Sequence, residues 1–120
     1  MAALIGNETT NLLLSKEPLP VTVKDAVPAF NFNGYEDAQG MMNSALRMRS
    51  PIILMASMGA ARYIGLKQTV GMIKGMAESV DIPVCLHLDH ATDAAFLKEA
   101  VVAGFTSVMI DASKKDFKEN

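Results

Sequence analysis

The sequence predicts an α/β protein built on a parallel sheet, because short apolar runs alternate along the chain with stretches of helical periodicity. Four strand-like runs occupy residues 27–32, 51–57, 82–89 and 106–111. The runs are continuously apolar, a pattern typical of strands that are covered on both faces. Strands that alternate with helices in this way form parallel sheets with crossover connections.

The first two units of this alternation are the most regular. The run VPAFNF (27–32) precedes a helical pattern over 35–49, and the run PIILMAS (51–57) precedes a second pattern over 65–80. In each pattern the apolar residues recur at helical spacing and form one stripe. The stripes comprise Ala38, Met41, Met42, Ala45 and Leu46 in the first pattern, and Leu66, Val70, Ile73, Ala77 and Val80 in the second.

The third unit joins the run IPVCLHLD (82–89) to a helical pattern over 92–104. We expect Thr92 to cap the start of this helix and Gly104 to end it. The run TSVMID (106–111) is the fourth expected strand. We therefore expect a single domain over residues 1–120, with an arm at about 1–25 followed by four strands and three intervening helices.

Composition narrows the class of protein. Eleven basic and thirteen acidic residues give a net charge of −2, so no basic excess indicates nucleic-acid binding. The lone cysteine, Cys85, excludes a disulfide framework and fits a reducing compartment. No stretch approaches the roughly 20 apolar residues of a membrane helix, and the N-terminus lacks the pattern of a signal peptide. We expect a soluble, cytoplasmic protein with no nucleic-acid or membrane partner.

Polar side chains gather where the expected strands end. Because the carboxyl ends of parallel strands meet at one edge of the sheet, these side chains are expected to converge, and sites in such folds are built there. The residues are Asn31 and Asn33 after the first strand, Ser57 after the second, Asp89 and His90 after the third, and Asp111 and Ser113 after the fourth.

Four blocks that carry these residues resemble one family. The blocks VPAFNFN, SPIILMASMGAARYIG, IPVCLHLDHATD and AGFTSVMIDAS are similar to the class II, metal-dependent fructose-bisphosphate aldolases, and the match runs from about Ala26 to Ser113. Tagatose-bisphosphate and other ketose-bisphosphate aldolases share these patterns. The resemblance implies a TIM-type (β/α)8 barrel, which needs about 250 residues. The four strands of this chain would form the N-terminal half of such a barrel.

The resemblance also implies roles for five residues. His90 would be a ligand of the catalytic zinc, whose other two histidines lie in the later half of the family's barrel. Asp89 would exchange a proton with the C4 hydroxyl of a phosphorylated sugar. Ser57 would contact substrate, Asn31 would contact substrate or support a residue that does, and Asp111 would bind a second divalent or monovalent cation. Ordinary structural roles remain open, namely a hydrogen-bonded His90, a helix-capping Asp89 and strand-end turns at the other three.

Strand geometry limits how Asp89 and His90 can cooperate. Neighbouring side chains of a regular strand point to opposite faces, so the two can serve one site only if the chain turns, and we expect that turn at 91–93. His87, on the strand face of Asp89, is interpreted as structural. Lys114 and Lys115 stand where many family members have a histidine and a proline, and a solvated charge pair is the expected role of these lysines.

Two functional hypotheses follow. In the first, the chain is part of a class II aldolase, acts on fructose bisphosphate or alternatively on tagatose bisphosphate, and is inactive alone because one histidine cannot hold a catalytic zinc. In the second, it is a non-catalytic half-barrel that assembles through its unpaired strand edges. In either case we expect a homo-oligomer.

Overall fold

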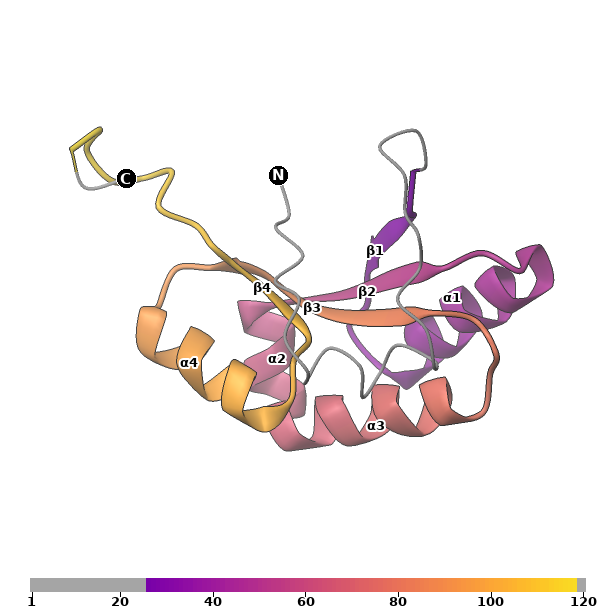
Figure 1. Cartoon of the computed structure of the whole chain (residues 1–120). Helices are drawn as coiled ribbons and strands as arrows, with labels where there is room; N and C mark the ends of the chain where they lie inside the picture. Colours follow the sequence, from indigo (N-terminus) through magenta and orange to yellow (C-terminus); the bar gives the residue numbers. More distant parts are fainter. Residues whose placement is uncertain (1–25, 119–120) are drawn as a thin grey trace.

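The computed structural model describes residues 26–118, so the arm expected over 1–25 lies outside the described residues. Four strands form one parallel sheet in the order β1-β2-β3-β4, which confirms the predicted α/β class (Figure 1). The elements are β1 (Ala29–Asn31), α1 (Tyr35–Met48), β2 (Ile52–Ser57), α2 (Met58–Ile64), α3 (Leu66–Glu78), β3 (Val84–Ala91), α4 (Ala94–Ala103) and β4 (Ser107–Ile110).

The described residues contain one helix more than the three expected. The additional helix, α2, directly follows β2, where the sequence suggested a strand-end turn. The hydroxyl oxygen of Ser57 caps it by accepting a hydrogen bond from Ala60 N at 3.2 Å, and Gly65, with φ +97°, follows its last residue. Seven residues make too few turns for a periodic apolar stripe to be visible in the sequence.

Helices α2, α3 and α4 lie on the same side of the sheet (Figure 1). In β2 the side chains that face them, Ile52, Leu54 and Ala56, are buried, whereas the alternate residues are only half-buried. Residues 84–88 of β3 are all buried, but β1 is exposed throughout. The expectation of strands covered on both faces therefore holds for the body of β3 and not for β1 or β2.

The core lies between the sheet and this helical layer. Leu54 of β2 and Leu86 of β3 are register partners with no exposed surface, and Met42 of α1 and Ile73 of α3 are almost fully buried. Each fully buried side chain of this size stabilises the fold by about 1.5–3 kcal/mol relative to an exposed one. This layer anchors the strands whose ends carry the polar residues.

Helix α4 is capped by Asp93 at its start and by Gly104 at its end. Asp93, and not Thr92, is the N-cap, because β3 continues to Ala91 and the helix starts only at Ala94. The Oδ1 atom of Asp93 accepts hydrogen bonds from Ala95 N at 2.9 Å and Phe96 N at 3.2 Å. Gly104, with φ +116°, is the C-cap as expected, in a left-handed conformation that favours glycine.

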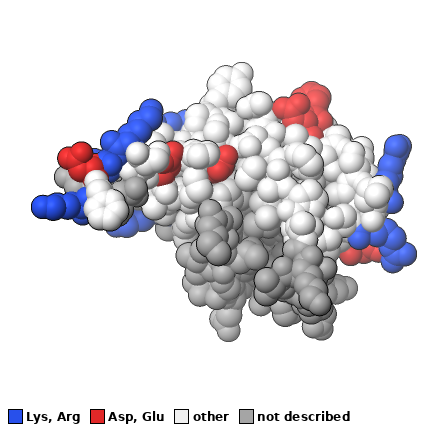
Figure 2. Space-filling view, turned by 90° about the horizontal axis from the view of Figure 1, so that it is seen from above, with Lys and Arg blue, Asp and Glu red and all other residues white. Residues whose placement is uncertain are grey.

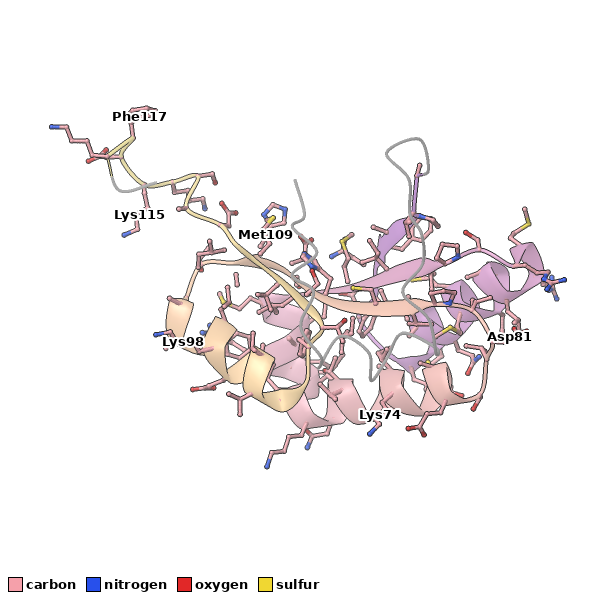
Figure 3. All side chains as sticks on the ribbon, in the orientation of Figure 1. Lys74, Asp81, Lys98, Met109, Lys115 and Phe117 are labelled. Carbon is pink, nitrogen blue, oxygen red and sulfur yellow. The ribbon has the colours of Figure 1, made fainter. Side chains whose placement is uncertain are left out.

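Basic side chains are unevenly distributed on the face of the molecule that Figure 2 shows. On the face shown in Figure 2, Lys and Arg gather at the two ends of the molecule and do not form a continuous basic strip. Lys74 on α3 and Lys98 on α4 point away from the sheet, and Lys115 and Phe117 lie on the segment that leaves β4 (Figure 3). None of the helices within residues 26–118 has the length and apolar character needed to cross a bilayer.

Candidate functional site

A bulge at the end of β3 brings two ionisable side chains together. His90 has a left-handed backbone with φ +50°, and the pairing of β3 with β4 shifts register between Leu88 and Ala91. A bulge of this kind interrupts the strict alternation of side chains. As a result Asp89 Oδ1 lies 3.8 Å from His90 Nε2. The chain therefore turns at His90, inside the strand, and not at the expected residues 91–93.

Four residues at the carboxyl ends of the strands, Asn31, Asp89, His90 and Asp111, form what we call the tip cluster. Asn31 Nδ2, on β1, donates a hydrogen bond to Asp89 Oδ2 at 3.0 Å. His90 Nδ1 is 2.9 Å from Asp111 Oδ2, at the end of β4. Asp89 and His90 link the two halves of the cluster. Residues from β1, β3 and the end of β4 are thus joined by successive contacts, as the sequence predicted for the strand ends.

Ser57 lies beside the tip cluster. It is the register partner of Asp89 on β2, and its hydroxyl oxygen accepts the hydrogen bond from Ala60 N that caps α2. A hydroxyl that accepts one hydrogen bond can still donate its own proton to another oxygen. Ser57 could therefore donate a hydrogen bond to a ligand at this edge of the sheet.

The two remaining strand-end residues have local roles. Asn33 N donates to Asp37 Oδ2 at 3.0 Å, which ties the end of β1 to the first turn of α1. Ser113 N donates to Asp111 Oδ1 at 3.0 Å. Lys114 and Lys115 lie on the exposed segment that follows. Through its hydrogen bond with Asp111, Ser113 contacts the tip cluster.

Hydrogen bonds, and to a smaller extent neighbouring charges, shift the pKa values of His90 and Asp111. The hydrogen bond with Asp111 and the nearby charge of Asp89 raise the pKa of His90 above its ordinary value. Hydrogen bonds from Ser113 and from His90 hold the pKa of Asp111 far below its usual range. Asp111 is consequently ionised at neutral pH, and its Oδ2 accepts a charge-assisted hydrogen bond whenever His90 is protonated.

One ring nitrogen of the cluster is suited to bind a metal. Histidines that bind metals through one ring nitrogen usually donate the other N–H to a carboxylate, and the contact of His90 Nδ1 with Asp111 leaves Nε2 for a cation. A catalytic zinc takes about three protein ligands. Residues 26–118 contain no group of three His, Cys, Asp or Glu side chains arranged to hold a metal. The described residues therefore do not complete a zinc site, and His90 could supply one ligand of it.

Beneath the cluster, His87 forms a buried polar pair. Its Nδ1 atom is 2.7 Å from Ser107 Oγ, its register partner on β4, and only 3% of the residue is exposed. Burial lowers the pKa of His87, against the opposing influence of the Asp89 charge. A neutral, hydrogen-bonded imidazole in this position agrees with the structural interpretation of His87.

Sequence reasoning missed Arg62, which connects α2 to the start of α4. Arg62 Nη2, on α2, lies 3.0 Å from Asp93 Oδ2, and its guanidinium carbon lies 4.7 Å from the centroid of the Phe96 ring. The arginine thereby ties α2, which follows Ser57, to the first turn of α4, which follows His90. No sequence signal pointed to this contact, because α2 itself was not predicted.

An apolar groove of about 650 Å³ runs beside the exposed edge strand β1. Residues from β1, from α1 and from the start of β2 line it, among them Phe30, Met41, Met48 and Ile52. Phe30 and Met48 are 51% and 77% exposed. Within residues 26–118, β1 pairs with β2 on one side only. Apolar side chains that are exposed beside such an edge indicate a surface suited to further packing.

Comparison with known proteins identifies the family. A family model described as "Fructose-bisphosphate aldolase class-II" matches residues 22–120. The fructose-bisphosphate aldolase of Geobacillus stearothermophilus is 49% identical over 100 residues, which are 81% of this chain and 35% of that protein. The fructose-bisphosphate aldolase of Helicobacter pylori strain J99 is 47% identical over 95 residues, which are 78% of this chain and 31% of the relative.

Solved structures agree with the family match. The crystal structure of the YdjI aldolase from Escherichia coli K12 superposes with a TM-score of 0.72 at 30% identity, over 79% of this chain and 37% of that one. The chain spans about a third of the length of the aldolases from Geobacillus stearothermophilus and Helicobacter pylori. Its parallel sheet and helices are half of a TIM-type barrel. The chain belongs to the class II fructose-bisphosphate aldolase family.

Proposed function

We propose that this chain supplies the N-terminal half of the active site of a class II aldolase. The reaction is the reversible cleavage of fructose 1,6-bisphosphate into dihydroxyacetone phosphate and an aldehyde phosphate. The observation that carries the proposal is the tip cluster, in which Asp89, His90 and Asp111 meet at the carboxyl edge of the sheet. The names of the relatives from Geobacillus stearothermophilus and Helicobacter pylori support fructose bisphosphate as the substrate.

Asp89 is the proposed base. Its side chain is 16% exposed, so it can meet a substrate while most of it is shielded from water. Asn31 holds one carboxylate oxygen, and the other is available to a ligand. In cleavage this carboxylate takes the proton of the substrate C4 hydroxyl while the bond between C3 and C4 breaks, and in condensation it returns that proton.

His90 is the proposed zinc ligand of this half, through Nε2, and Asp111 orients the ring through Nδ1. When bound at such a site, a divalent cation polarises the ketone carbonyl and stabilises the negative charge left by cleavage. Both oxygens of Asp111 accept hydrogen bonds, and each keeps a lone pair with which Asp111 could also bind a second cation. The remaining zinc ligands are proposed to lie outside the described residues.

Substrate binding is proposed to involve Ser57, whose hydroxyl proton can be donated to an oxygen of the phosphorylated sugar. Tagatose bisphosphate is the alternative substrate of the same chemistry. The two sugars differ in configuration at C4, which is the carbon whose hydroxyl Asp89 would deprotonate. Relative turnover of the two bisphosphates by an intact enzyme that contains this segment would identify the preferred one.

A second candidate function is that of a non-catalytic assembly unit, which the groove beside β1 favours. An exposed parallel edge strand next to an apolar groove can pair with a strand of another polypeptide. In this case the chain would form a homo-oligomer that shields the groove. Size-exclusion chromatography with light scattering measures the oligomeric state. A monomer at micromolar concentration would contradict the assembly function.

The catalytic proposal is tested in two steps. The 120-residue chain alone is expected not to cleave fructose 1,6-bisphosphate in the presence of zinc, since it offers one histidine to the metal. In an intact enzyme that contains this segment, Asp89→Ala should lower turnover by about 10²–10⁴-fold with zinc content unchanged. His90→Ala should lose the zinc itself.

Lys74→Ala, on the outer side of α3, is the matched control and should alter neither turnover nor zinc content (Figure 3). Zinc is measured by atomic emission on dialysed protein, so that metal content is read independently of activity. Full turnover by Asp89→Ala, or full zinc content in His90→Ala, would contradict the assigned roles.

A further inference from the structure

We infer that Asn31 is a positioning residue for the Asp89 carboxylate, and that this is its main contribution to the reaction. The inference rests on the proposed function, since it assigns a task to Asn31 relative to the base. The resemblance alone left substrate contact and support of another residue as alternatives. The contact between Asn31 Nδ2 and Asp89 Oδ2, at 3.0 Å, favours the support of Asp89.

The contact joins strands that are not neighbours. Asn31 is aligned with Met55 of β2, and Met55 is aligned with His87 of β3, two residues before Asp89. In a flat sheet, side chains separated by a whole strand and by two residues would lie too far apart for a hydrogen bond. The bond forms because the sheet curls as a barrel does. The position of Asn31 is held by the adjacent backbone bond from Phe32 N to Met55 O, at 2.9 Å.

The chemistry of the pair allows a single orientation of the amide. An ionised carboxylate only accepts hydrogen bonds, so Asn31 must present its NH2 group to Asp89. The resulting bond to a charged acceptor is stronger than a neutral one. It occupies Oδ2 and restricts rotation of the carboxylate. The other oxygen, Oδ1, is then directed toward His90, whose Nε2 lies 3.8 Å away.

The two oxygens of Asp89 therefore have different tasks. Oδ2 is held by the amide, and Oδ1 is presented on the side of the proposed metal ligand, where a substrate hydroxyl would lose its proton. Misplacement of a reacting group by about 1 Å can lower a rate by about 10²-fold. Removal of the amide should consequently act on the chemical step more than on substrate binding.

The hydrogen bond can be tested in the 120-residue chain itself. In a ¹⁵N-labelled sample at constant pH, the side-chain NH2 resonances of Asn31 are expected to shift in Asp89→Ala, because the acceptor of their hydrogen bond is lost. Asn43 provides an internal control, because its side-chain oxygen accepts from Gln39 Nε2 and has no carboxylate partner in the described contacts. Resonances of Asn31 that change as little in Asp89→Ala as those of Asn43 would overturn the inference.

Kinetics of an intact enzyme that contains this segment test the positioning role. Asn31→Ala should lower kcat by about 10–100-fold, the usual effect of losing a residue that orients a reacting group, and leave KM within about twofold. Asn31→Asp preserves the shape of the side chain but replaces the donor with a second carboxylate. It should lower kcat further and move the acid limb of the pH–rate profile to higher pH.

Asn43→Ala is the matched control and should leave both constants unchanged. A rise in KM at constant kcat would instead make Asn31 a substrate contact and overturn the positioning role. An unsubstituted enzyme that fails to cleave fructose 1,6-bisphosphate would refute the proposed function. The hydrogen bond would still be decided by the response of the Asn31 resonances to Asp89→Ala, so the two failures are distinguishable.

Discussion

Asp93 performs two separate tasks with its two carboxylate oxygens, and substitutions can separate them. Oδ1 caps α4 by accepting from Ala95 N and Phe96 N, and Oδ2 pairs with Arg62 at 3.0 Å. Loss of an N-cap costs about 1 kcal/mol, with a range of about 0.5–2. The side chains of Arg62 and Asp93 are 51% and 44% exposed, so solvent screening limits the ion pair to about 0.2–1 kcal/mol.

These magnitudes predict different effects for two substitutions. Asp93→Ser keeps a good capping oxygen and loses the ion pair, so it should lower the free energy of unfolding by less than about 1 kcal/mol. Asp93→Ala loses both contacts and should cost about 1–2 kcal/mol. Arg62→Met loses the ion pair together with the interaction of its guanidinium with the Phe96 ring, which contributes about 0.5–1 kcal/mol at an exposed site.

Urea-induced unfolding followed by circular dichroism measures these differences. In the Arg62→Met background, Asp93→Ser should have almost no further effect, because its partner is already absent, and a double-mutant cycle gives the coupling energy. Sodium chloride at 1 M should weaken the effect of Asp93→Ser but not the difference between the serine and alanine variants. Glu78→Ser, in an exposed ion pair on α3, is the matched control. Equal destabilisation by Asp93→Ser and Asp93→Ala would refute the division of tasks.

Two further predictions concern a backbone position and a buried histidine. Gly104→Ala should destabilise the fold by about 1–2 kcal/mol, because φ is +116° and the added Cβ would lie 3.0 Å from Val70 Cγ1. Gly71→Ala, in open space on α3, should instead stabilise the fold by about 0.5–1 kcal/mol. Equal effects of the two substitutions in urea unfolding would contradict the strain argument. Burial lowers the pKa of His87 below its ordinary value of 6.5, so the folded state favours the neutral ring. The stabilisation by this residue should be complete above pH 6.5 and decrease as the pH falls toward the lowered pKa. Contributions from His90 cancel when the unsubstituted chain is compared with His87→Gln. The difference in unfolding free energy between the two should therefore shrink from pH 7.5 to pH 5. A difference independent of pH would contradict a neutral, buried His87.

The sequence by itself determined the class of fold and the edge of the sheet at which polar residues gather. Apolar runs and helical stripes are local patterns, and the folded chain buries these same residues in one shared core. The four strands and helices α1, α3 and α4 therefore lie close to their predicted ranges. The short α2 and the one-residue displacement of the α4 cap from Thr92 to Asp93 depend on local hydrogen bonds that no periodicity reveals.

The tertiary structure alone decided which strand-end residues meet. Asn31 and Asp89 are 58 residues apart and belong to strands separated by β2, so their contact depends on the curl of the whole sheet. Asp89 and His90 approach each other because of a bulge whose left-handed residue is a histidine, a conformation that no residue pattern announced. The partnership of His90 with Asp111 follows from the shifted register of β3 and β4. Curl, bulge and register arise from strand pairing over long sequence separations, which is the physical reason why a local pattern can place residues at an edge but cannot choose their partners.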